Sequence, residues 1–322
     1  MKDAVKISAR LFALSSTVSS ALAGTYNRAE HIVGTGFYNS FNFEAISDPT
    51  HGRVNYVDEA TAKSQNLTFA SSSTFILRAD AKTVISASSA VGRNSVRIRS
   101  NNAYSTHVAV FDIAHMPQGC GTWPAVWETD EANWPAGGEV DIIEGVNDQG
   151  TDQVTLHTNP GCTMPASRTE TGTALQLDCN VNVNGNTGCG VSVGQAPSYG
   201  PTFNGAGGGW YAIERTNTFI SVWFWSRNSA TVPADVKAGG TSVNTASWGT
   251  PVANFPNTSC NFPQFFDANN IIINLTFCGD WAGQASIYAA SGCPSTCVDY
   301  VDNNPAAFTN AYFQFNSINT YT

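Results

Sequence analysis

Short apolar runs rich in β-branched and aromatic residues recur along the chain, and Gly, Asn, Pro and Ser separate them. In residues 75–78 and 96–99, alternate positions divide into two faces, with Arg on one face only, as in half-buried strands. The predicted strands are residues 74–77, 95–99, 107–113, 139–144, 154–158, 210–214, 219–225, 271–277 and 311–318. Helical periodicity is almost absent, and only residues 58–64 predict a short helix. Many short strands with so little helix predict an all-β sandwich or barrel.

Two connections stand out between these runs. Residues 214–218, E-R-T-N-T, predict a hairpin turn. Residues 161–209 hold three Cys and many Gly and Asn, and so long an irregular segment is more plausible when it is cross-linked. The chain of 322 residues shows no internal repeat and no linker. We therefore expect one domain, because all-β domains often reach about 200–250 residues.

The N-terminus has the pattern of a secretory signal. A basic start and a short apolar middle lead to Ala21-Leu22-Ala23, an A-x-A cleavage site before Gly24. The alternative is a short N-terminal helix. We predict a signal peptide at residues 1–23, a catalytic domain at residues 24–322 and a secreted, extracellular protein.

Eight cysteines, all beyond residue 23, agree with export and predict up to four disulfides. The pairing stays open, although the short separations Cys179/Cys189 and Cys293/Cys297 permit local bridges. Cysteine zinc sites need C-x₂-C pairs or a nearby His, which are missing here. Among three N-x-S/T sequons, Asn66 is the predicted glycosylation site, whereas Asn274 lies in an apolar run and is expected to stay unmodified.

Charge and composition narrow the ligand class. The net charge is −9, and the 15 Lys and Arg are not clustered, so we expect no nucleic-acid partner. Apolar stretches stay below the roughly 18 residues of a membrane helix, so we expect no membrane partner. Charged residues make up only 12% of the chain, and eight Trp are present. This composition suits a neutral, hydroxyl-rich ligand.

The segment G-G-E-V-D-I-I-E-G places Glu139, Asp141 and Glu144 within six residues. On a regular strand Glu139 and Asp141 share one face, and Glu144 lies on the other. One extra residue at Ile142-Ile143, a β-bulge, brings all three to the same face. Mutual repulsion then raises the pKa of at least one of these acids and leaves one protonated acid beside one carboxylate. Retaining glycoside hydrolysis requires these two groups. A calcium site or a solvated acidic face is the alternative.

Aromatic residues surround this segment. Trp127 and Trp134 are candidate platforms for sugar rings, whereas Trp223 and Trp225 are expected to pack in the core. His157, on the next predicted strand, is placed to hydrogen-bond an active carboxylate. The G-x-S-x-G segment around Ser192 is not a serine-hydrolase site, because every His precedes it and Pro and Gly follow it where a helix is needed.

Three blocks, E-V-D-I-I-E, W-P-A-V-W and the G-D-W-A-G of residues 279–283, together resemble glycoside hydrolase family 16, and most of all its fungal endo-β-1,3(4)-glucanases, or laminarinases. The resemblance continues through residues 48–57, 92–98 and 210–225, and so covers nearly all of residues 24–322. It implies a concanavalin A-like β-jelly-roll sandwich of two antiparallel sheets with a concave substrate cleft. The xyloglucan-acting branch has one residue fewer between the last two carboxylates, which argues against that substrate.

The resemblance also implies roles for individual residues. Glu139 would be the nucleophile, Asp141 the residue that tunes the pair, and Glu144 the acid/base. Sugar contacts next to the cleaved bond would come from Trp127, Trp134, His157 and Trp281. Further sugar contacts would come from Asn94 and Arg97. The family's calcium site has no motif that we can locate here, so we expect no metal.

These expectations combine into a secreted, retaining endo-glycosidase that acts on β-1,3 and mixed β-1,3/1,4 glucans. We expect a monomer whose partner is a β-glucan polysaccharide or oligosaccharide and which needs no cofactor. Two alternatives stay open, a β-glucan transglycosylase and a non-catalytic β-glucan-binding protein on the same fold.

Overall fold

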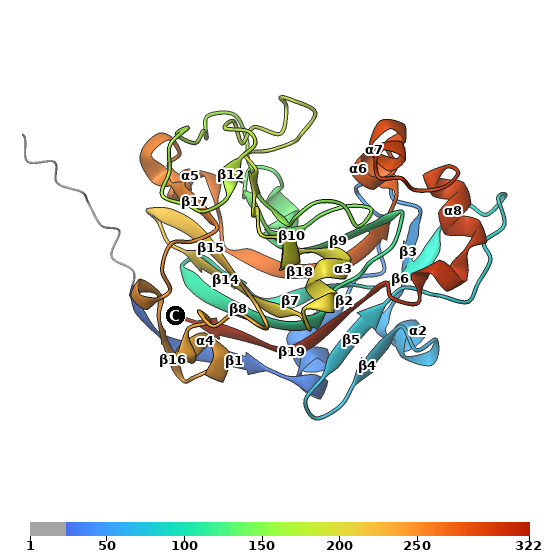
Figure 1. Cartoon of the computed structure of the whole chain (residues 1–322), viewed down its shortest axis with the longest axis horizontal. Coiled ribbons are helices and arrows are strands. Elements are labelled where there is room, and N and C mark those ends of the chain that lie inside the picture. The colour runs from blue at the N-terminus through green and yellow to red at the C-terminus, as the bar shows by residue number, and fades with distance from the viewer. Residues whose placement is uncertain (1–23) are drawn as a thin grey trace, which may run out of the picture.

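The computed structural model describes residues 24–322, and the predicted signal peptide lies outside the described residues. Two large antiparallel sheets form the two layers of a sandwich (Figure 1). The predicted all-β sandwich is therefore confirmed. Within the described part of the chain, no helix is both long enough and apolar enough to cross a membrane.

The first sheet has the strand order β16-β1-β19-β8-β14-β15-β17, with β5 and β4 attached through β19. Its strands are β1 (Thr25–Ile32), β4 (Thr68–Ala70), β5 (Phe75–Arg78), β8 (His107–His115), β14 (Gly209–Arg215), β15 (Phe219–Ser226), β16 (Ser242–Asn244), β17 (Ala253–Pro256) and β19 (Tyr312–Tyr321). The turn between β14 and β15 is the predicted hairpin, since the two strands pair along their whole length.

The second sheet has the order β12-β13-β11-β10-β9-β18-β7-β2 and carries the acidic segment on a central strand, β10. Its strands are β2 (Phe41–Phe43), β7 (Arg97–Tyr104), β9 (Thr122–Thr129), β10 (Glu139–Glu144), β11 (Gln153–His157), β12 (Thr173–Ala174), β13 (Val191–Ser192) and β18 (Asn269–Phe277). A small parallel pair, β3 (Val54–Tyr56) and β6 (Arg93–Ser95), was not predicted. Each of the nine predicted strands overlaps a strand of the structure.

The helices are more numerous than expected. The predicted one is confirmed as α2 (Glu59–Ser64), which begins where the Asp58 carboxylate accepts the backbone N–H of Thr61. The others are α1 (Phe37–Ser40), α3 (Gly200–Gly205), α4 (Ala234–Ala238), α5 (Phe262–Phe265), α6 (Gly279–Ala282), α7 (Ala285–Ala290) and α8 (Cys297–Asn303), with 3₁₀ turns at Gly34–Gly36, Glu131–Asn133, Ala196–Ser198, Thr245–Ser247, Asn257–Ser259 and Pro305–Phe308. Helices this short contain too few turns to give a repeated apolar face, which is why the sequence pattern missed them.

The main core fills the space between the two sheets. From β10 it takes Val140, Ile142 and Ile143, all completely buried. A second cluster covers the opposite face of the first sheet, where Trp223 and Trp225 each pack edge-on against Trp248. The prediction that Trp223 and Trp225 are core residues is therefore confirmed.

All eight cysteines form disulfides. The pairs are Cys120–Cys293, Cys162–Cys260, Cys179–Cys189 and Cys278–Cys297. Four bridges agree with the cysteine count, and the segment 161–209 is cross-linked as expected. Of the two possible local bridges only Cys179–Cys189 forms, because Cys293 and Cys297 pair with residues from other parts of the chain.

Candidate active site

The β-bulge predicted in β10 is present. Asp141 lies opposite Trp127 of β9, and the next paired residue is Ile143, opposite Val126, so Ile142 is the extra residue. Both isoleucines are completely buried. The extra residue brings Glu144 to the face shared by Glu139 and Asp141, because it offsets the alternation by one position.

Glu139 is held by the indole of Trp134, whose Nε1–H donates a hydrogen bond of 2.6 Å to Oε2. The other oxygen, Oε1, lies 4.0 Å from Nε2 of His157. Burial raises the pKa of Glu139 to about 7, although the Trp134 hydrogen bond opposes the shift. Glu139 can therefore exist in both protonation states near neutral pH.

Glu144 is held in the same way by a different indole. Trp123 Nε1–H donates 2.9 Å to Oε1 of Glu144. Burial raises the pKa of Glu144 to about 7, and the Trp123 hydrogen bond opposes it. Trp123 was not among the predicted site residues, although it lies four residues before Trp127 on one strand, a spacing that places both side chains on one face.

Asp141 lies between these groups and is 2% exposed. Its Oδ2 is 3.4 Å from Nε2 of His157 and forms no hydrogen bond with the described residues. Burial, followed by the charges of Glu139 and Glu144, raises the pKa of Asp141 well above its usual range. The protonated form of Asp141 is therefore favoured relative to that of a free aspartate.

His157 lies on β11 directly opposite Glu139, as the sequence predicted for a neighbouring strand. Its Nδ1 is 2.9 Å from Oδ1 of Asn186. Burial lowers the pKa of His157, so its ring is neutral at neutral pH. Glu139, Asp141 and His157 offer three possible ligand atoms within 4.8 Å. Trp134 and Asn186 engage the other polar atoms of two of these residues, Oε2 of Glu139 and Nδ1 of His157.

A further acid that the sequence analysis missed lies behind Glu144. Asp152 is completely buried, and its Oδ1 accepts the backbone N–H of Glu144 at 2.9 Å. Burial raises the pKa of Asp152 well above its usual range. Its backbone N–H is held by the hydroxyl of Ser198 at 3.0 Å. Asp152 therefore fixes the end of β10 through its hydrogen bond to the backbone of Glu144.

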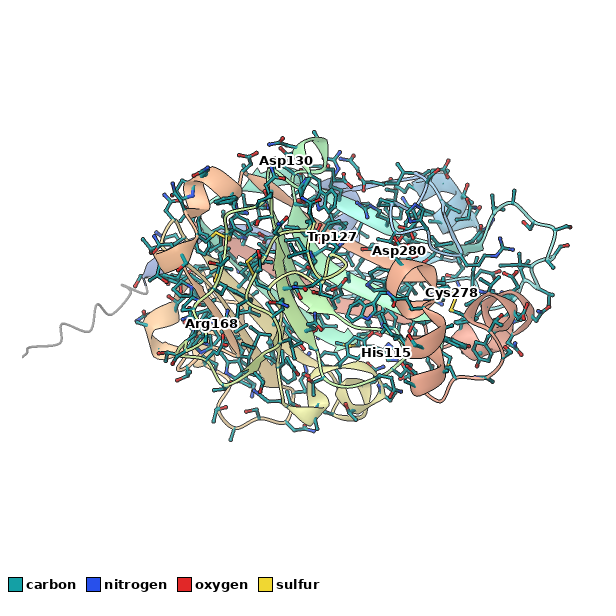
Figure 2. The ribbon with its side chains drawn as sticks, turned by 90° about the horizontal axis from the view of Figure 1, so that it is seen from above. His115, Trp127, Asp130, Arg168, Cys278 and Asp280 are labelled. Atoms are coloured by element: carbon teal, nitrogen blue, oxygen red, sulfur yellow. A yellow bond between two sulfur atoms is a disulfide. The ribbon has the colours of Figure 1, made fainter. Side chains whose placement is uncertain are left out.

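Several indole rings lie near the carboxylates. Trp127 of β9 (Figure 2) donates its Nε1–H to Oδ1 of Asn274 at 2.7 Å, and the guanidinium of Arg97 lies 5.0 Å from its ring. Trp281 of α6 packs edge-on against Trp123, with ring centroids 5.7 Å apart. Trp134 is 45% exposed. The strand β11 lies on the other side of β10 from β9. The acidic groups therefore lie between the residues of β9 and those of β11.

The two more distant sugar contacts already have protein partners. Arg97, with a side chain 3% exposed, forms ion pairs with Glu44 and Glu131. Asn94 of β6 hydrogen-bonds Asn55 and Gln65 rather than any β10 carboxylate. Their direct contact with sugar stays a prediction, and the structure shows Arg97 as a support for Trp127.

The sequons differ in accessibility. Asn66 is exposed and therefore accessible to a glycan. Its glycosylation stays a prediction. Asn274 is 6% exposed and engaged by Trp127 and Tyr56, which agrees with the expectation that it is unmodified. Ser192 lies on β13 and hydrogen-bonds Thr151, so no hydrolase elbow forms there.

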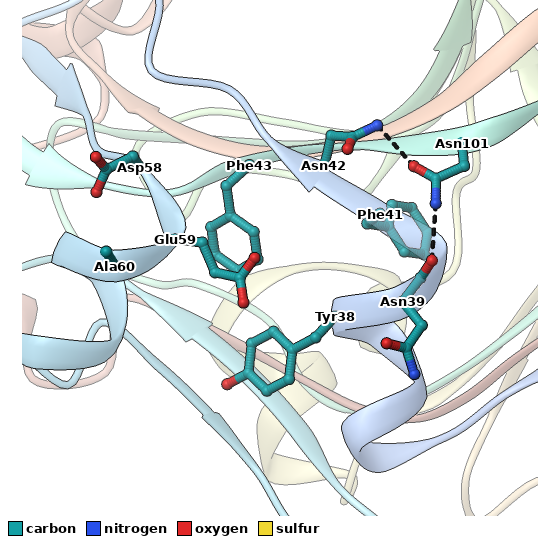
Figure 3. Close-up of a pocket in the computed structure, with 9 residues that line it drawn as sticks. All are labelled: Tyr38, Asn39, Phe41, Asn42, Phe43, Asp58, Glu59, Ala60 and Asn101. Atoms are coloured by element: carbon teal, nitrogen blue, oxygen red, sulfur yellow. Dashed lines mark hydrogen bonds between the residues drawn. The ribbon is translucent and has the colours of Figure 1, made fainter.

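A separate hollow of about 680 Å³ lies beside β2, the edge strand of the second sheet (Figure 3). Asn42 donates to Asn101, which in turn donates to the carbonyl of Asn39. The lining residues are Tyr38, Asn39, Phe41, Asn42, Phe43, Asp58, Glu59, Ala60 and Asn101. None of the predicted site residues is among them, so the candidate active site is the acidic face of β10.

Two glutamates with raised pKa values, an aspartate between them and flanking indoles, on one face of a β-sandwich, match the groups that a glycoside hydrolase requires. The family model described as "XgeA-like, catalytic GH16 domain" matches residues 41–321. The chain belongs to glycoside hydrolase family 16.

Several known proteins are similar to this chain. A probable glycosidase of Schizosaccharomyces pombe is 43% identical over 302 residues, which are 93% of this chain and 70% of that protein. A probable endo-1,3(4)-β-glucanase of Aspergillus fumigatus is also 43% identical, over 92% of this chain and 45% of that protein, so the chain spans about half its length.

Two solved structures are also similar. The GH16 Laminarinase 16A of Phanerochaete chrysosporium, solved with β-glucans in its donor and acceptor sites, has 63% identity and a TM-score of 0.92, over 92% of this chain and all of that one. An elongating family 16 β-1,3-glucosyltransferase has 36% identity and a TM-score of 0.85, with the same coverage.

Proposed function

We propose that this chain is an endo-acting β-glucanase that cleaves β-1,3 bonds in laminarin-like and mixed-linkage β-1,3/1,4 glucans with retention of configuration. The observation that carries the proposal is the bulged strand β10, which gathers Glu139, Asp141 and Glu144 on one face. The names of the relatives support β-glucan as the substrate class.

In the first step Glu139 attacks the anomeric carbon as a carboxylate, while Glu144 donates its proton to the leaving glycosidic oxygen. The C–O bond to the leaving sugar breaks as the ester bond to Glu139 forms. The shorter indole hydrogen bond, 2.6 Å to Glu139 against 2.9 Å to Glu144, favours the ionised form on Glu139. The raised pKa of Asp141 favours its protonated form, which keeps a second negative charge away from the nucleophile.

In the second step Glu144, now a carboxylate, removes a proton from water, and the water oxygen attacks the anomeric carbon. The bond to Glu139 breaks, and the sugar is released with its original β configuration. Glu144 is again protonated and Glu139 again ionised. These residues complete the cycle without a metal or another cofactor.

The surrounding rings fit a neutral glucan. Trp127, Trp134 and Trp281 offer apolar faces to pyranose rings, and His157 adds a polar group beside the cleaved bond. We propose that residues 24–322 are one catalytic domain that acts as a secreted monomer after loss of residues 1–23. Four disulfides are compatible with this location.

The residue roles are tested by azide rescue with a substrate that carries a good leaving group. In Glu144→Ala the intermediate still forms on Glu139, and azide should attack it to give a β-glycosyl azide. In Glu139→Ala azide enters the vacated space and should give an α-glycosyl azide. The opposite anomers would reverse the two assignments, and full activity of both variants on laminarin would exclude this strand as the catalytic one.

Transglycosylation is the second candidate, because a glucosyltransferase is among the similar structures. It uses the same intermediate, with a sugar hydroxyl in place of water. Product sizing at high oligosaccharide concentration separates the two reactions, since longer products require transfer. Laminarin, lichenan and cellulose then give the linkage preference. A non-catalytic binding protein would release no reducing sugar from any of them.

A further inference from the structure

The Cys179–Cys189 disulfide closes a short loop that is attached to the backbone on both sides of His157. Cys179 accepts the N–H of Thr158 at 2.8 Å, and Cys189 donates its N–H to the carbonyl of Leu156 at 3.1 Å. Both cysteines are completely buried. The two ends of the loop are therefore fixed to β11 directly before and after the histidine.

The loop also lies against the imidazole itself. A Cβ on Gly188 would lie 2.8 Å from Cε1 of His157 and 2.6 Å from the carbonyl of Leu156, and the φ of Gly188 is +60°. Only glycine meets both conditions, because a larger residue would displace the ring and would be strained at this φ. The loop thus closes over the face of β11 that carries His157.

Asn186 is the residue of this loop that contacts the imidazole with a polar group. Its Oδ1 lies 2.9 Å from Nδ1 of His157. Because an amide oxygen only accepts hydrogen bonds, Nδ1 carries the proton of the neutral ring. Nε2 is then an acceptor, and it faces Oδ2 of Asp141 at 3.4 Å and Oε1 of Glu139 at 4.0 Å.

We propose that Asn186 is a positioning residue, which the Cys179–Cys189 bridge holds so that His157 stays in the Nδ1–H tautomer and offers its Nε2 lone pair to Asp141. The inference rests on the proposed function, because its purpose is to direct the proton of Asp141 away from the nucleophile. Without Asn186 the ring can adopt the other tautomer. An Nε2–H would favour ionised Asp141 beside Glu139, which repels the nucleophilic carboxylate.

The loop provides a matched control. Asn184 and Asn186 both have positive φ, 51° and 61°, and both are exposed, but only Asn186 reaches His157. An alanine therefore introduces similar backbone strain at either position. Asn186→Asp keeps an acceptor oxygen and tolerates the left-handed conformation, so it is the conservative variant.

The kinetic test compares these variants on laminarin. Asn186→Ala should lower kcat by about tenfold with little change in KM, because the reacting groups lose their alignment whereas the sugar platforms remain. Asn184→Ala should match the wild type, and Asn186→Asp should recover most of the loss. Equal losses in Asn184→Ala and Asn186→Ala would overturn the proposal, since they would indicate only a strained loop.

The spectroscopic test needs no substrate, so its result is independent of the proposed function. The chain has five histidines, and ¹⁵N spectra of the imidazoles distinguish protonated from unprotonated ring nitrogens. His157 is assigned as the signal missing in His157→Asn. We expect Nδ1 protonated and Nε2 unprotonated in the wild type and in Asn186→Asp, and Nε2 protonation in Asn186→Ala. Protonated Nε2 in the wild type would overturn the proposal.

The role of the bridge is tested by a double-mutant cycle. Removing the disulfide by replacing Cys179 and Cys189 with Ser should lower kcat to a similar degree, and adding Asn186→Ala should lower it little further. Fully additive losses would show that the bridge does not act through Asn186. Circular dichroism of each variant identifies any that fail to fold, and Asn186→Ala alone, at an exposed position, still tests the tautomer.

Discussion

Trp123 donates its indole N–H to the carboxylate of Glu144 at 2.9 Å, and this contact joins the proposed acid/base to one of the indoles beside it. The same ring packs edge-on against Trp281. Trp134 makes the corresponding bond to Glu139 at 2.6 Å. Each glutamate thus has one indole donor, which stabilises its ionised form and opposes the effect of desolvation on its pKa.

Trp123→Phe keeps the aromatic packing but removes the donor to Glu144. The pKa of Glu144 should rise, because its ionised form loses a hydrogen bond, and Glu144 then stays protonated to higher pH. The alkaline limb of the kcat/KM profile on laminarin should move up by about 1 pH unit, since a hydrogen bond to a charged group contributes about 1.5–3 kcal/mol. An unchanged alkaline limb would contradict the acid role of Glu144.

Trp134→Phe should move the opposite limb. Without its indole donor Glu139 stays protonated to higher pH, and a protonated carboxyl is not a nucleophile. The acid limb of kcat/KM should therefore shift upward by about 1 pH unit while the alkaline limb stays in place. The two Trp variants are controls for each other, and a shift of the same limb in both would show that Glu139 and Glu144 titrate as one unit.

The sequence predicted the bulge in β10 well because its signal is local. Three acids within six residues, with two adjacent isoleucines, allow only a bulge if all the acids are to share one face. The residues that surround those acids were harder to predict from the sequence. Asn186 comes from an irregular loop 29 residues beyond His157, and nothing in its neighbourhood indicates which ring it meets.

Asp152 was missed for a related reason. An isolated aspartate before a strand resembles a turn residue, and only the folded structure shows that it is completely buried behind Glu144. The sequence also left the disulfide pairing undetermined, because Cys293 pairs with Cys120 across 173 residues. Pairing at that distance depends on the packing of the two sheets, which no sequence spacing encodes.

Asp152→Asn should change how stability depends on pH. Because burial raises the pKa of Asp152 in the folded state, its stabilising effect is complete below about pH 4, near the pKa of an unfolded aspartate, and is lost as pH rises through the folded value. Asn cannot ionise. The free energy of unfolding of the variant should therefore increase relative to the wild type between about pH 4 and pH 8.

Urea unfolding at several pH values, with the disulfides intact, measures this difference. Asp299→Asn, at an exposed position on α8, is the matched control and should show no such trend. A constant difference between Asp152→Asn and the wild type would mean that Asp152 does not change its protonation over this range. A decreasing difference would mean that it is ionised and stabilised in the folded protein.

The last prediction separates indoles that bind substrate from indoles that support the fold. Trp127 and Trp281 are only half-buried, whereas Trp223 is 5% exposed within the aromatic cluster on the opposite face of the first sheet. Trp127→Ala and Trp281→Ala should each lower kcat/KM on laminarin by about tenfold, since an aromatic contact contributes about 0.5–1.5 kcal/mol beyond its buried area. Their thermal unfolding should stay close to that of the wild type.

Trp223→Ala is the control for core packing. It should lower the free energy of unfolding by about 3–5 kcal/mol, the usual cost of removing a large buried aromatic side chain, and any loss of activity should follow the loss of folded protein. Laminarin kinetics and thermal unfolding of the three variants distinguish the two roles. If Trp127→Ala and Trp281→Ala unfold as readily as Trp223→Ala, these rings support the fold, and the proposed sugar platforms must be assigned to other residues.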